Sequence, residues 1–297
     1  MARVADEVVL DTSDHASLAD AWKAYGARIG RELPRAVGIA AAGPVGGAEL
    51  RLTNNRWVIR PDEIPKTLDV DRFKLVNDFG AVAYAVSALE SACFRHLCGP
   101  DEPLPDTGVI SVVGPGTGLG VAVLVRGRGG ARVIEAEGAH GDFSPTNPLE
   151  DLILTRLRAV HGRVSIERVV SGPGLVEIHS ALAADRGQSV QSVESADLWD
   201  QALRGEDALA VAALERFFQC LGTATGNIAL TQGAQAVVIG GGLGQRLADR
   251  LPSSGFEARF RGKGRMEDRM AAMPVKVITY PEPGLYGAAV AFAEADG

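Results

Sequence analysis

Short apolar runs alternate along the chain with longer segments of helical periodicity. Apolar runs bounded by glycine or polar residues predict buried strands, and apolar positions spaced three or four residues apart predict helices. Predicted strands cover 36–43, 74–78, 109–114, 118–126, 131–138, 235–242 and 275–280. Predicted helices cover 17–32, 81–92, 147–161, 207–230 and 284–295. This alternation of strands and helices indicates an α/β fold.

Local signals support several of these elements. Ser17 is a candidate N-cap for the first predicted helix, and Asn147 followed by Pro148 is a typical start for the helix at 147–161. The short segments 49–53 and 57–59 are expected to pair as antiparallel strands. Residues 95–108 are rich in Pro and Gly, and we expect them to connect two lobes.

Composition excludes several classes of protein. With 297 residues, 46% hydrophobic and 23% charged, the chain has room for a large core and two lobes. A net charge of −7 argues against a sequence-independent nucleic-acid binder, which needs a basic surface. Three cysteines are too few for a four-cysteine zinc site and suggest reduced thiols. Neither a membrane-length apolar run nor an N-terminal leader pattern occurs, so we expect no membrane partner and a cytoplasmic location.

The most glycine-rich turn, GPGTGLG at 114–120, lies between two predicted strands. A dinucleotide fingerprint needs a helix after the glycines and a P-loop needs a following lysine, and this segment has neither. A hairpin of this kind can still line a phosphate with its backbone N–H groups, to which Thr117 would add a hydroxyl donor. The alternative is a tight hairpin whose glycines serve only the backbone conformation.

An asparagine and an aspartate, Asn77 and Asp78, stand at the end of the predicted strand 74–78. Ligands of open α/β sheets bind at the carboxyl ends of strands. The Asp78 carboxylate could therefore accept a proton from an attacking hydroxyl, and Asn77 could hold that hydroxyl or its neighbour. The alternative is that the aspartate caps the helix predicted at 81–92.

Two further segments combine glycines with acidic side chains. At 239–244 a strand ends in glycines where a helix begins, which lets a nucleobase or ribose approach the backbone, although close helix–strand packing needs the same glycines. Glu137 and His140 follow a predicted strand, and Glu167 begins a helix before a Ser-Gly-Pro-Gly turn. Such groups near glycine turns suit a polyhydroxylated ligand. A lone Glu early in a helix, however, usually serves the helix dipole, and a lone His is usually structural.

Taken together and in order, these segments resemble the bacterial glucokinase family. The matching segments are LTNNRW (52–57), VNDFGAVA (76–83), GPGTGLG (114–120), EGAHGDFSP (137–145), ERVVSGPGL (167–175), IGGGLG (239–244), SGFEARFRGKGRM (254–266) and PEPGLYGAA (281–289). They cover almost the whole chain in colinear order, which makes the resemblance specific.

The resemblance implies a fold and an activity. The fold is α/β, the two-lobed actin-like ATPase (ribonuclease H-like) fold, usually as a homodimer with a cleft between the lobes. The small lobe would comprise 1–90, completed by the helix 284–297, and the large lobe 91–283. The implied activity transfers the γ-phosphoryl group of ATP, with Mg²⁺, to the 6-hydroxyl of glucose. Such chemistry depends mainly on positioning and charge neutralisation.

The resemblance also assigns roles to individual residues. The family's general base matches Asp78. Its hexose-binding positions match Asn77, Glu137, His140 and Glu167. Its second phosphate loop matches Gly114, Gly116, Thr117 and Gly118, and its adenosine-side glycines match Gly240 and Gly241. No residue of this chain is assigned as a metal ligand.

The sequence departs from the family pattern in two places. Ala139 stands where the family commonly has Gly, and we expect little effect. The larger departure is that no Asp-x-Gly-Gly-Thr occurs in the 297 residues, whereas the family opens with a strand ending in that turn, whose Asp helps to hold the metal. We therefore expect an incomplete small lobe. Either the start is misassigned in a longer active enzyme, or the chain is a non-catalytic relative.

Three alternatives to a glucokinase stay open on the sequence. One is a sugar-binding relative without catalysis, which would bind glucose tightly but not ATP. Another is a kinase for a different hexose, including the repressor-related sugar kinases, although their cysteine-rich zinc motif has no counterpart after His140. The last is a largely unfolded truncation product, which would express poorly and protect its amides loosely.

Overall fold

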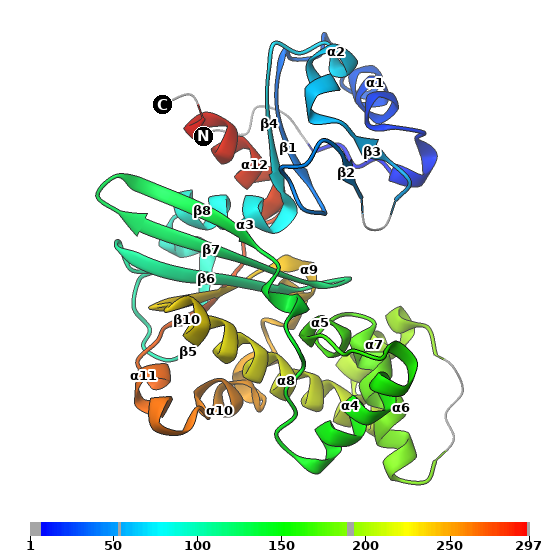
Figure 1. Cartoon of the computed structure of the whole chain (residues 1–297), viewed down its shortest axis with the longest axis vertical. Coiled ribbons are helices and arrows are strands. Elements are labelled where there is room, and N and C mark those ends of the chain that lie inside the picture. The colour runs from blue at the N-terminus through cyan, green and yellow to red at the C-terminus, as the bar shows by residue number, and fades with distance from the viewer. Residues whose placement is uncertain (1–6, 53–54, 189–192, 296–297) are drawn as a thin grey trace. The chain divides into compact units, whose positions relative to one another are not determined.

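A computed structural model describes residues 7–52, 55–188 and 193–295. The chain forms two compact units, one from Met1–Ala85 together with Gly284–Gly297 and the other from Val86–Pro283 (Figure 1). We describe each unit by itself. The lobe limits predicted from the sequence, 1–90 with 284–297 and 91–283, differ from these units by five residues at the first junction and have the same second junction.

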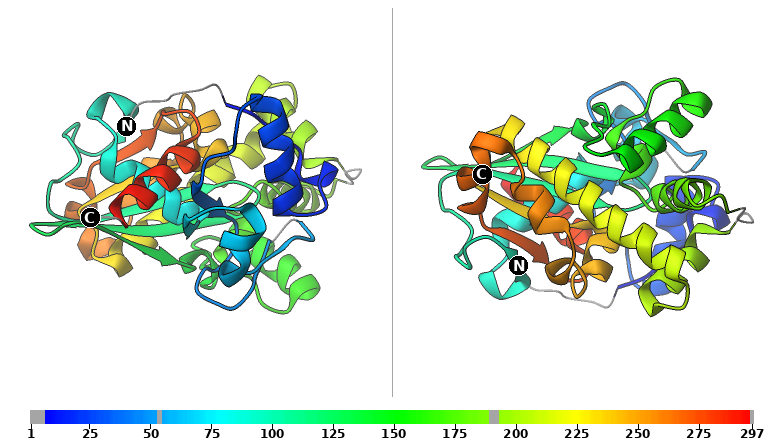
Figure 2. Two further views of the ribbon diagram at one scale, coloured as in Figure 1. Left: turned by 90° about the horizontal axis from the view of Figure 1, so that it is seen from above. Right: turned by 90° about the horizontal axis from the view of Figure 1, so that it is seen from below.

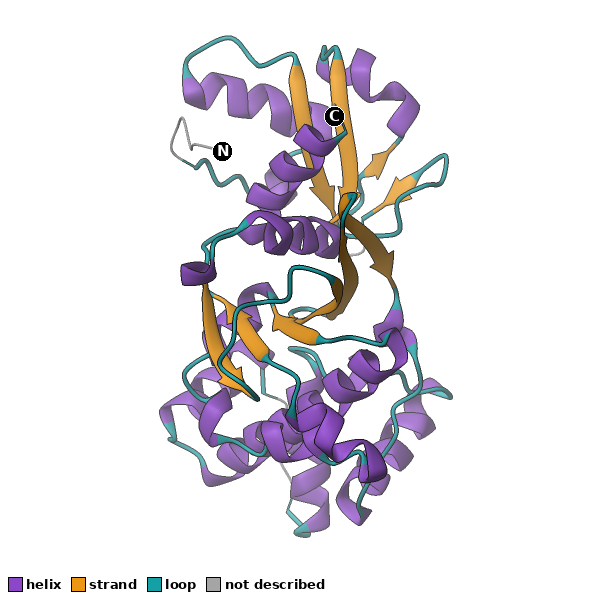
Figure 3. Ribbon diagram, turned by 90° about the vertical axis from the view of Figure 1, so that its left-hand side faces the viewer, coloured by secondary structure: helices purple, strands orange, loops and turns teal. Residues whose placement is uncertain are grey.

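The first unit contains two long parallel strands, which lie side by side in Figure 3. They pair from Ala36 with Arg72 to Ala41 with Asn77. The strands of this unit are β1 (Ala36–Ala41), β4 (Arg72–Asn77) and the short antiparallel pair β2 (Leu50–Arg51) and β3 (Val58–Ile59). The helices are α1 (Leu18–Ile29), α2 (Ile64–Leu68), α12 (Pro283–Glu294) and the first part of α3 (Asp78–Ala88).

Close helix packing holds the first unit together. A Cβ atom on Gly287 of α12 would lie only 1.7 Å from the carbonyl oxygen of Ala81 in α3. A Cβ on Gly38 of β1 would lie 2.5 Å from the carbonyl oxygen of Ala288. The C-terminal helix therefore packs backbone to backbone against both α3 and β1, and glycine is required at both contacts.

The second unit is built on a six-stranded mixed sheet with the order β5-β10-β9-β6-β7-β8. Its strands are β5 (Phe94–Cys98), β6 (Gly108–Pro115), β7 (Leu119–Gly127), β8 (Gly130–Ala136), β9 (Ala236–Ile239) and β10 (Val275–Ile278). The three middle strands β10, β9 and β6 run parallel. The strands added at either side, β5 on one and β7 and β8 on the other, are antiparallel to their neighbours.

Eight helices pack on this sheet and on one another, among the residues that the structure describes. They are α4 (Pro148–His161), α5 (Ile166–Val169), α6 (Gly174–Asp185), α7 (Ser195–Arg204), α8 (Ala208–Gln232), α9 (Gly241–Leu247), α10 (Phe256–Arg261) and α11 (Glu267–Ala271). The long helix α8 crosses one face of the sheet (Figure 2). It begins at the N-cap Asp207 and ends at Gly233 in a left-handed conformation.

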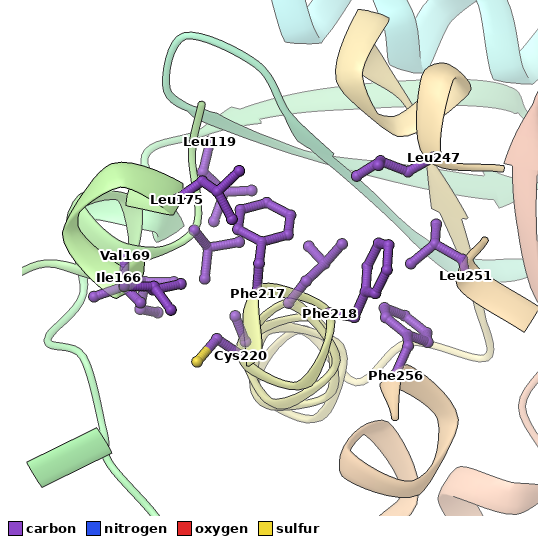
Figure 4. Close-up of a cluster of buried hydrophobic side chains, with 14 of the residues drawn as sticks. Leu119, Ile166, Val169, Leu175, Phe217, Phe218, Cys220, Leu247, Leu251 and Phe256 are labelled. Carbon is purple, nitrogen blue, oxygen red and sulfur yellow. The ribbon is translucent and has the colours of Figure 1, made fainter. Parts of the chain in front are cut away.

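The core of the second unit is organised around α8. Phe217 points toward Leu119 and Leu175, whereas Phe218 lies beside Phe256 (Figure 4). All five side chains are buried, with exposed fractions of 4% or less. Removing each of these large side chains from water stabilises the fold by roughly 1.5–3 kcal/mol.

The structure confirms the predicted strands and long helices with small shifts at their ends, and the predicted caps Ser17 and Asn147 accept hydrogen bonds from Asp20 and Glu150 backbone N–H groups. Two predictions were wrong. The helix expected at 81–92 begins at Asp78 and ends at Ala88, because Asn77 caps it. The segment 95–108 is not wholly a connection, because its first residues form the edge strand β5.

The segment 52–57, which carries part of the family resemblance, includes positions 53–54, which lie outside the described residues. None of the described helices combines the length and the apolar character that a membrane span requires.

Candidate functional site

The glycine segment 114–120 forms the hairpin turn between β6 and β7. Gly114 pairs with Gly120, and Pro115 pairs with Leu119. Inside the turn, the Gly116 N–H donates to the Gly118 carbonyl oxygen at 2.8 Å. No described atom lies within 4 Å of the position that a Cβ on Gly116 would occupy, and Thr117 at the tip is exposed. At Gly116 and Thr117 the turn therefore presents open backbone and one hydroxyl, which a phosphate could approach.

Glu167 of α5 holds one side of this turn. Its Oε2 atom accepts a hydrogen bond from the Leu119 N–H at 3.0 Å. A Cβ on Gly118 would lie 2.3 Å from the same oxygen. The carboxylate therefore approaches the hairpin as closely as a glycine allows. Glu167, to which the family resemblance assigns a role in sugar binding, is thus hydrogen-bonded to the turn to which it assigns phosphate binding.

Replacing Gly118 by alanine is expected to lower the free energy of unfolding by about 1–3 kcal/mol. The new methyl group would push the Glu167 carboxylate away and break its bond to Leu119. The matched control is Gly116→Ala, where the methyl group meets open space and should change stability far less. Urea denaturation of the two variants measures the difference. Equal stabilities would show that the contact between Glu167 and the turn is not formed.

Glu137 follows β8 as the N-cap of the short 3₁₀ turn Gly138–His140, and His140 is the last residue of that turn. Glu137 Oε2 is 3.7 Å from His140 Nε2, and the two side chains are 61% and 57% exposed. The chain then pairs with the segment before α5, since the Phe143 N–H donates to Val164 at 3.0 Å and the Ile166 N–H to Gly141 at 2.9 Å. This pairing brings Glu137 and His140 to α5, the helix that carries Glu167.

Gly240 and Gly241 lie at the same edge of the sheet as the hairpin turn. Strands β6 and β9 are parallel neighbours, so their carboxyl ends meet there, and the Gly240 N–H donates to the Val113 carbonyl oxygen at 2.8 Å. Gly241 has a φ of 77°, in the left-handed region that glycine adopts freely. The second unit thus gathers both glycine segments with the three polar residues Glu137, His140 and Glu167.

Asn77 and Asp78 belong to the first unit, where β4 passes into α3. The Asn77 Oδ1 atom accepts from the N–H groups of Phe79 at 2.8 Å and Gly80 at 3.1 Å, and its Nδ2 donates to Gly43 at 3.0 Å. Asn77, rather than the aspartate considered from the sequence, is therefore the N-cap of α3. Its side chain is held in place by these three bonds.

Asp78 is the first residue of α3, and its carboxyl stays accessible to solvent. Desolvation raises the pKa of this carboxyl above its usual range, and the hydrogen bond from the Phe79 N–H opposes this only in part. A carboxylate with a raised pKa holds a proton more strongly. That property suits a general base.

A buried ion cluster fixes the chain that leads from His140 into α4. Glu150 is 1% exposed, and its carboxylate accepts from Arg259 Nη2 at 2.8 and 2.9 Å and from Arg216 Nη1 at 3.1 Å. Its Oε2 atom also accepts from the backbone N–H and the hydroxyl of Thr146, at 2.8 and 2.9 Å. The segment 254–266, noted in the sequence only for its family resemblance, supplies Arg259 to this cluster.

Sequence reasoning missed the supports behind the hairpin turn. The Gly172 N–H donates to the Gly116 carbonyl oxygen at 2.7 Å, and the Gly172 carbonyl oxygen accepts from Ser195 and Trp199. The Ser-Gly-Pro-Gly turn is recognisable in the sequence, but nothing in the local sequence connects it to Trp199. Within the described part of the chain, no three His, Cys, Asp or Glu side chains gather closely enough to hold a metal ion.

Comparisons with known proteins agree with this arrangement. A family model described as Glucokinase matches residues 2–295. A glucokinase of Zymomonas mobilis is 55% identical over 288 residues, which are 97% of this chain and 89% of that protein.

Solved structures show the same likeness. The glucokinase of an Antarctic psychrotroph superposes with a TM-score of 0.81 at 32% identity, and the match covers 96% of this chain and 88% of that one. The glucokinase of Balamuthia mandrillaris, solved in complex with glucose, has a TM-score of 0.75 at 23% identity and covers 92% and 81%. These likenesses confirm the predicted α/β fold class.

Proposed function

The chain belongs to the glucokinase family, and we propose that it transfers the γ-phosphoryl group of ATP to the 6-hydroxyl of glucose. The observation that carries the residue-level proposal is the cluster in the second unit. There, Glu137, His140 and Glu167 gather at the edge of the sheet where the two glycine segments lie. A polyhydroxylated acceptor and a phosphate donor need these two kinds of group next to each other.

The acidic residues and the histidine are proposed to bind the sugar. Glu167 uses Oε2 for the Leu119 N–H, which leaves Oε1 for a sugar hydroxyl. Glu137 and His140 are both more than half exposed, and their side chains lie 3.7 Å apart. The Glu137 carboxylate can accept from one sugar hydroxyl, and a ring nitrogen of His140 can bind a neighbouring one. Asn77 has its side-chain oxygen engaged as a helix cap. Asn77 is proposed to contact the sugar with this same side-chain amide, whose nitrogen also donates to Gly43.

Asp78 is proposed as the general base. In the reaction, the O6 oxygen of glucose forms a bond to the γ-phosphorus, the bond from that phosphorus to the bridging oxygen of ADP breaks, and the O6 proton passes to the Asp78 carboxylate. The raised pKa of Asp78 makes it a stronger base. Its position at the start of α3, next to the N-cap Asn77, fixes its direction.

The donor is proposed to bind along the two glycine segments. A phosphate can approach the backbone of the turn at Gly116, where a Cβ would meet open space. The adenosine part is proposed to approach the half-buried Gly241 and the buried Gly240 beside it. Mg²⁺ would neutralise phosphate charge when bound. Because no group of three potential ligand side chains gathers among the described residues, the ion is proposed to be held mainly by the phosphates and water.

The test is a coupled assay of glucose 6-phosphate formation with ATP and Mg²⁺, repeated with other hexoses and with ADP or polyphosphate as donor. Glucose and ATP should give the highest kcat/KM. If another hexose gives a higher kcat/KM than glucose, that hexose is the substrate. Calorimetric binding of glucose without any turnover would favour the sugar-binding alternative.

Replacing Glu137 by alanine is expected to raise KM for glucose by about 10–100-fold, because a hydrogen bond to a charged group is lost. KM for ATP should stay within about twofold, since the lost contact is to the sugar. Glu102→Ala, at an exposed carboxylate in the 99–107 loop, is the control and should change neither constant. An unchanged KM for glucose in the Glu137 variant would remove Glu137 from the sugar site.

The family also suggests an assembly and a compartment. We propose a homodimer, which light scattering of the purified protein would test, and a cytoplasmic location, which fractionation of cells would test. The lobe limits 1–90 with 284–297 and 91–283 likewise remain a proposal, which limited proteolysis would examine.

A further inference from the structure

Gly172 connects two parts of the second unit that are distant in sequence. It lies in the turn between α5 and α6. Its N–H donates to the Gly116 carbonyl oxygen at 2.7 Å. Its carbonyl oxygen accepts two bonds from α7, one from the Ser195 hydroxyl at 3.0 Å and one from the Trp199 indole N–H at 2.9 Å. Helix α7 is therefore joined through a single residue to the hairpin turn.

Trp199 is a rigid support. It is 3% exposed, and its ring meets Phe217 edge to face, with ring centres 5.0 Å apart at 86°. Phe217 is fully buried on α8. A buried indole N–H needs an acceptor, and the Gly172 carbonyl oxygen is that acceptor. The packing of the ring thus fixes where this carbonyl can lie.

The contact between Gly172 and the hairpin is close. A Cβ on Gly172 would lie 3.1 Å from the Gly116 carbonyl oxygen, which is tighter than an ordinary van der Waals contact. Glu167 holds the other end of the same turn through Leu119. Hydrogen bonds from outside the hairpin therefore hold both ends of the turn, from the Gly172 N–H at Gly116 and to the Glu167 carboxylate at Leu119. The tip of the turn stays exposed.

We propose that Trp199 and Ser195 are positioning residues that set the phosphate-binding geometry of the Gly116–Gly118 turn by holding Gly172. The inference rests on the proposed function, in which this turn binds the donor phosphates. Phosphoryl transfer depends on positioning, and small displacements of a positioning group reduce the rate strongly. Neither residue touches substrate; both act through Gly172.

The experiment compares Trp199→Phe, Ser195→Ala and the double variant by steady-state kinetics. Phenylalanine keeps an aromatic ring against Phe217 but removes the N–H. We expect each single variant to raise KM for ATP about fivefold, because one hydrogen bond is lost, and the double variant to raise it further. KM for glucose should stay within about twofold. A purely structural role would lower the thermal midpoint and the active fraction without separating the two KM values.

The matched control is Trp22→Phe, in the first unit. Trp22 also donates its indole N–H to a backbone carbonyl, that of Leu68 at 3.1 Å, so the chemical change is the same. This variant should leave KM for ATP unchanged. If Trp199→Phe folds poorly, Ser195→Ala alone decides, since Ser195 is only partly buried at the start of α7.

A spectroscopic measurement gives a readout independent of turnover. In a Trp22→Phe, Trp57→Phe background, Trp199 is the only tryptophan. We expect titration with ATP, and with inorganic tripolyphosphate, to change its emission, and the Ser195→Ala change to weaken both responses. If the wild-type enzyme is active and KM for ATP is unchanged in all Trp199 and Ser195 variants, this inference is overturned and the proposed function stands. A wild-type chain that neither binds ATP nor phosphorylates glucose would overturn both.

Discussion

Replacing Asp78 by asparagine is expected to lower kcat for glucose phosphorylation by about 10²–10⁴-fold, the usual contribution of a general base. The amide keeps the shape of the side chain but cannot accept the O6 proton. Stability should not suffer. A carboxyl whose pKa is raised in the folded state stabilises the fold only while protonated, and that contribution is lost as pH rises through the folded pKa.

The pH dependence of kcat gives a second test of Asp78. The base acts when it is ionised, so kcat in the wild-type enzyme should fall as pH drops through the pKa of Asp78, which partial desolvation of the carboxyl places above the usual aspartate value. The residual activity of Asp78→Asn should lack this acid limb. Asp185→Asn, at an exposed position at the end of α6, is the control. If Asp78→Asn retains kcat within about threefold of wild type and binds glucose normally, Asp78 is not the base.

Replacing Glu150 by glutamine is expected to lower the free energy of unfolding by about 3–5 kcal/mol, the usual cost of breaking a buried ion pair from one side. Arg259 and Arg216 would lose their common carboxylate, and the Thr146 hydroxyl and N–H would face a weaker acceptor. Urea denaturation measures the loss. Glu257→Gln is the control, because Glu257 pairs with Arg261 at the surface and should cost at most about 1 kcal/mol.

Glu150 also predicts how stability depends on pH. Burial alone would raise its pKa, but the bonds from Thr146 and Asn147 and the charge of Arg259 outweigh burial, so the net pKa is lowered. Its contribution to stability is therefore fully present above the pKa of an unfolded glutamate and is lost as pH falls through the lower folded value. The wild-type chain should lose more stability on acidification than Glu150→Gln. Parallel losses in the two proteins would contradict the proposed role of the cluster.

Sequence alone was sufficient for most of the secondary structure of this protein. The apolar runs predicted β6, β7 and β9, and the pair Asn147–Pro148 marked the start of α4, because caps and periodic burial are signals within a few residues. The start of α3 was misplaced by three residues. There the deciding contact is Asn77 with the N–H groups of Phe79 and Gly80, whereas the sequence suggested the neighbouring Asp78 as the cap.

The order of motifs along the chain also determined the family and named the candidate residues, since Asp78, Glu137, His140 and Glu167 each follow a recognisable strand or glycine turn. Which of these residues share a neighbourhood was decided only by tertiary structure. The second unit joins Glu137 and His140 to Glu167 through the pairing of residues 141–143 with 164–166, and no local pattern encodes that pairing.

Trp199 shows the same limit most clearly. In the sequence it stands in a segment for which no helix or strand was predicted, with nothing to distinguish it from a core side chain. Its hydrogen bond reaches Gly172, 27 residues earlier, and Gly172 in turn reaches Gly116. Local conformation depends on contacts between near neighbours in the chain, and the family was recognised from short motifs of the same kind. The supports of the site depend on contacts between distant segments, which exist only after the chain has packed.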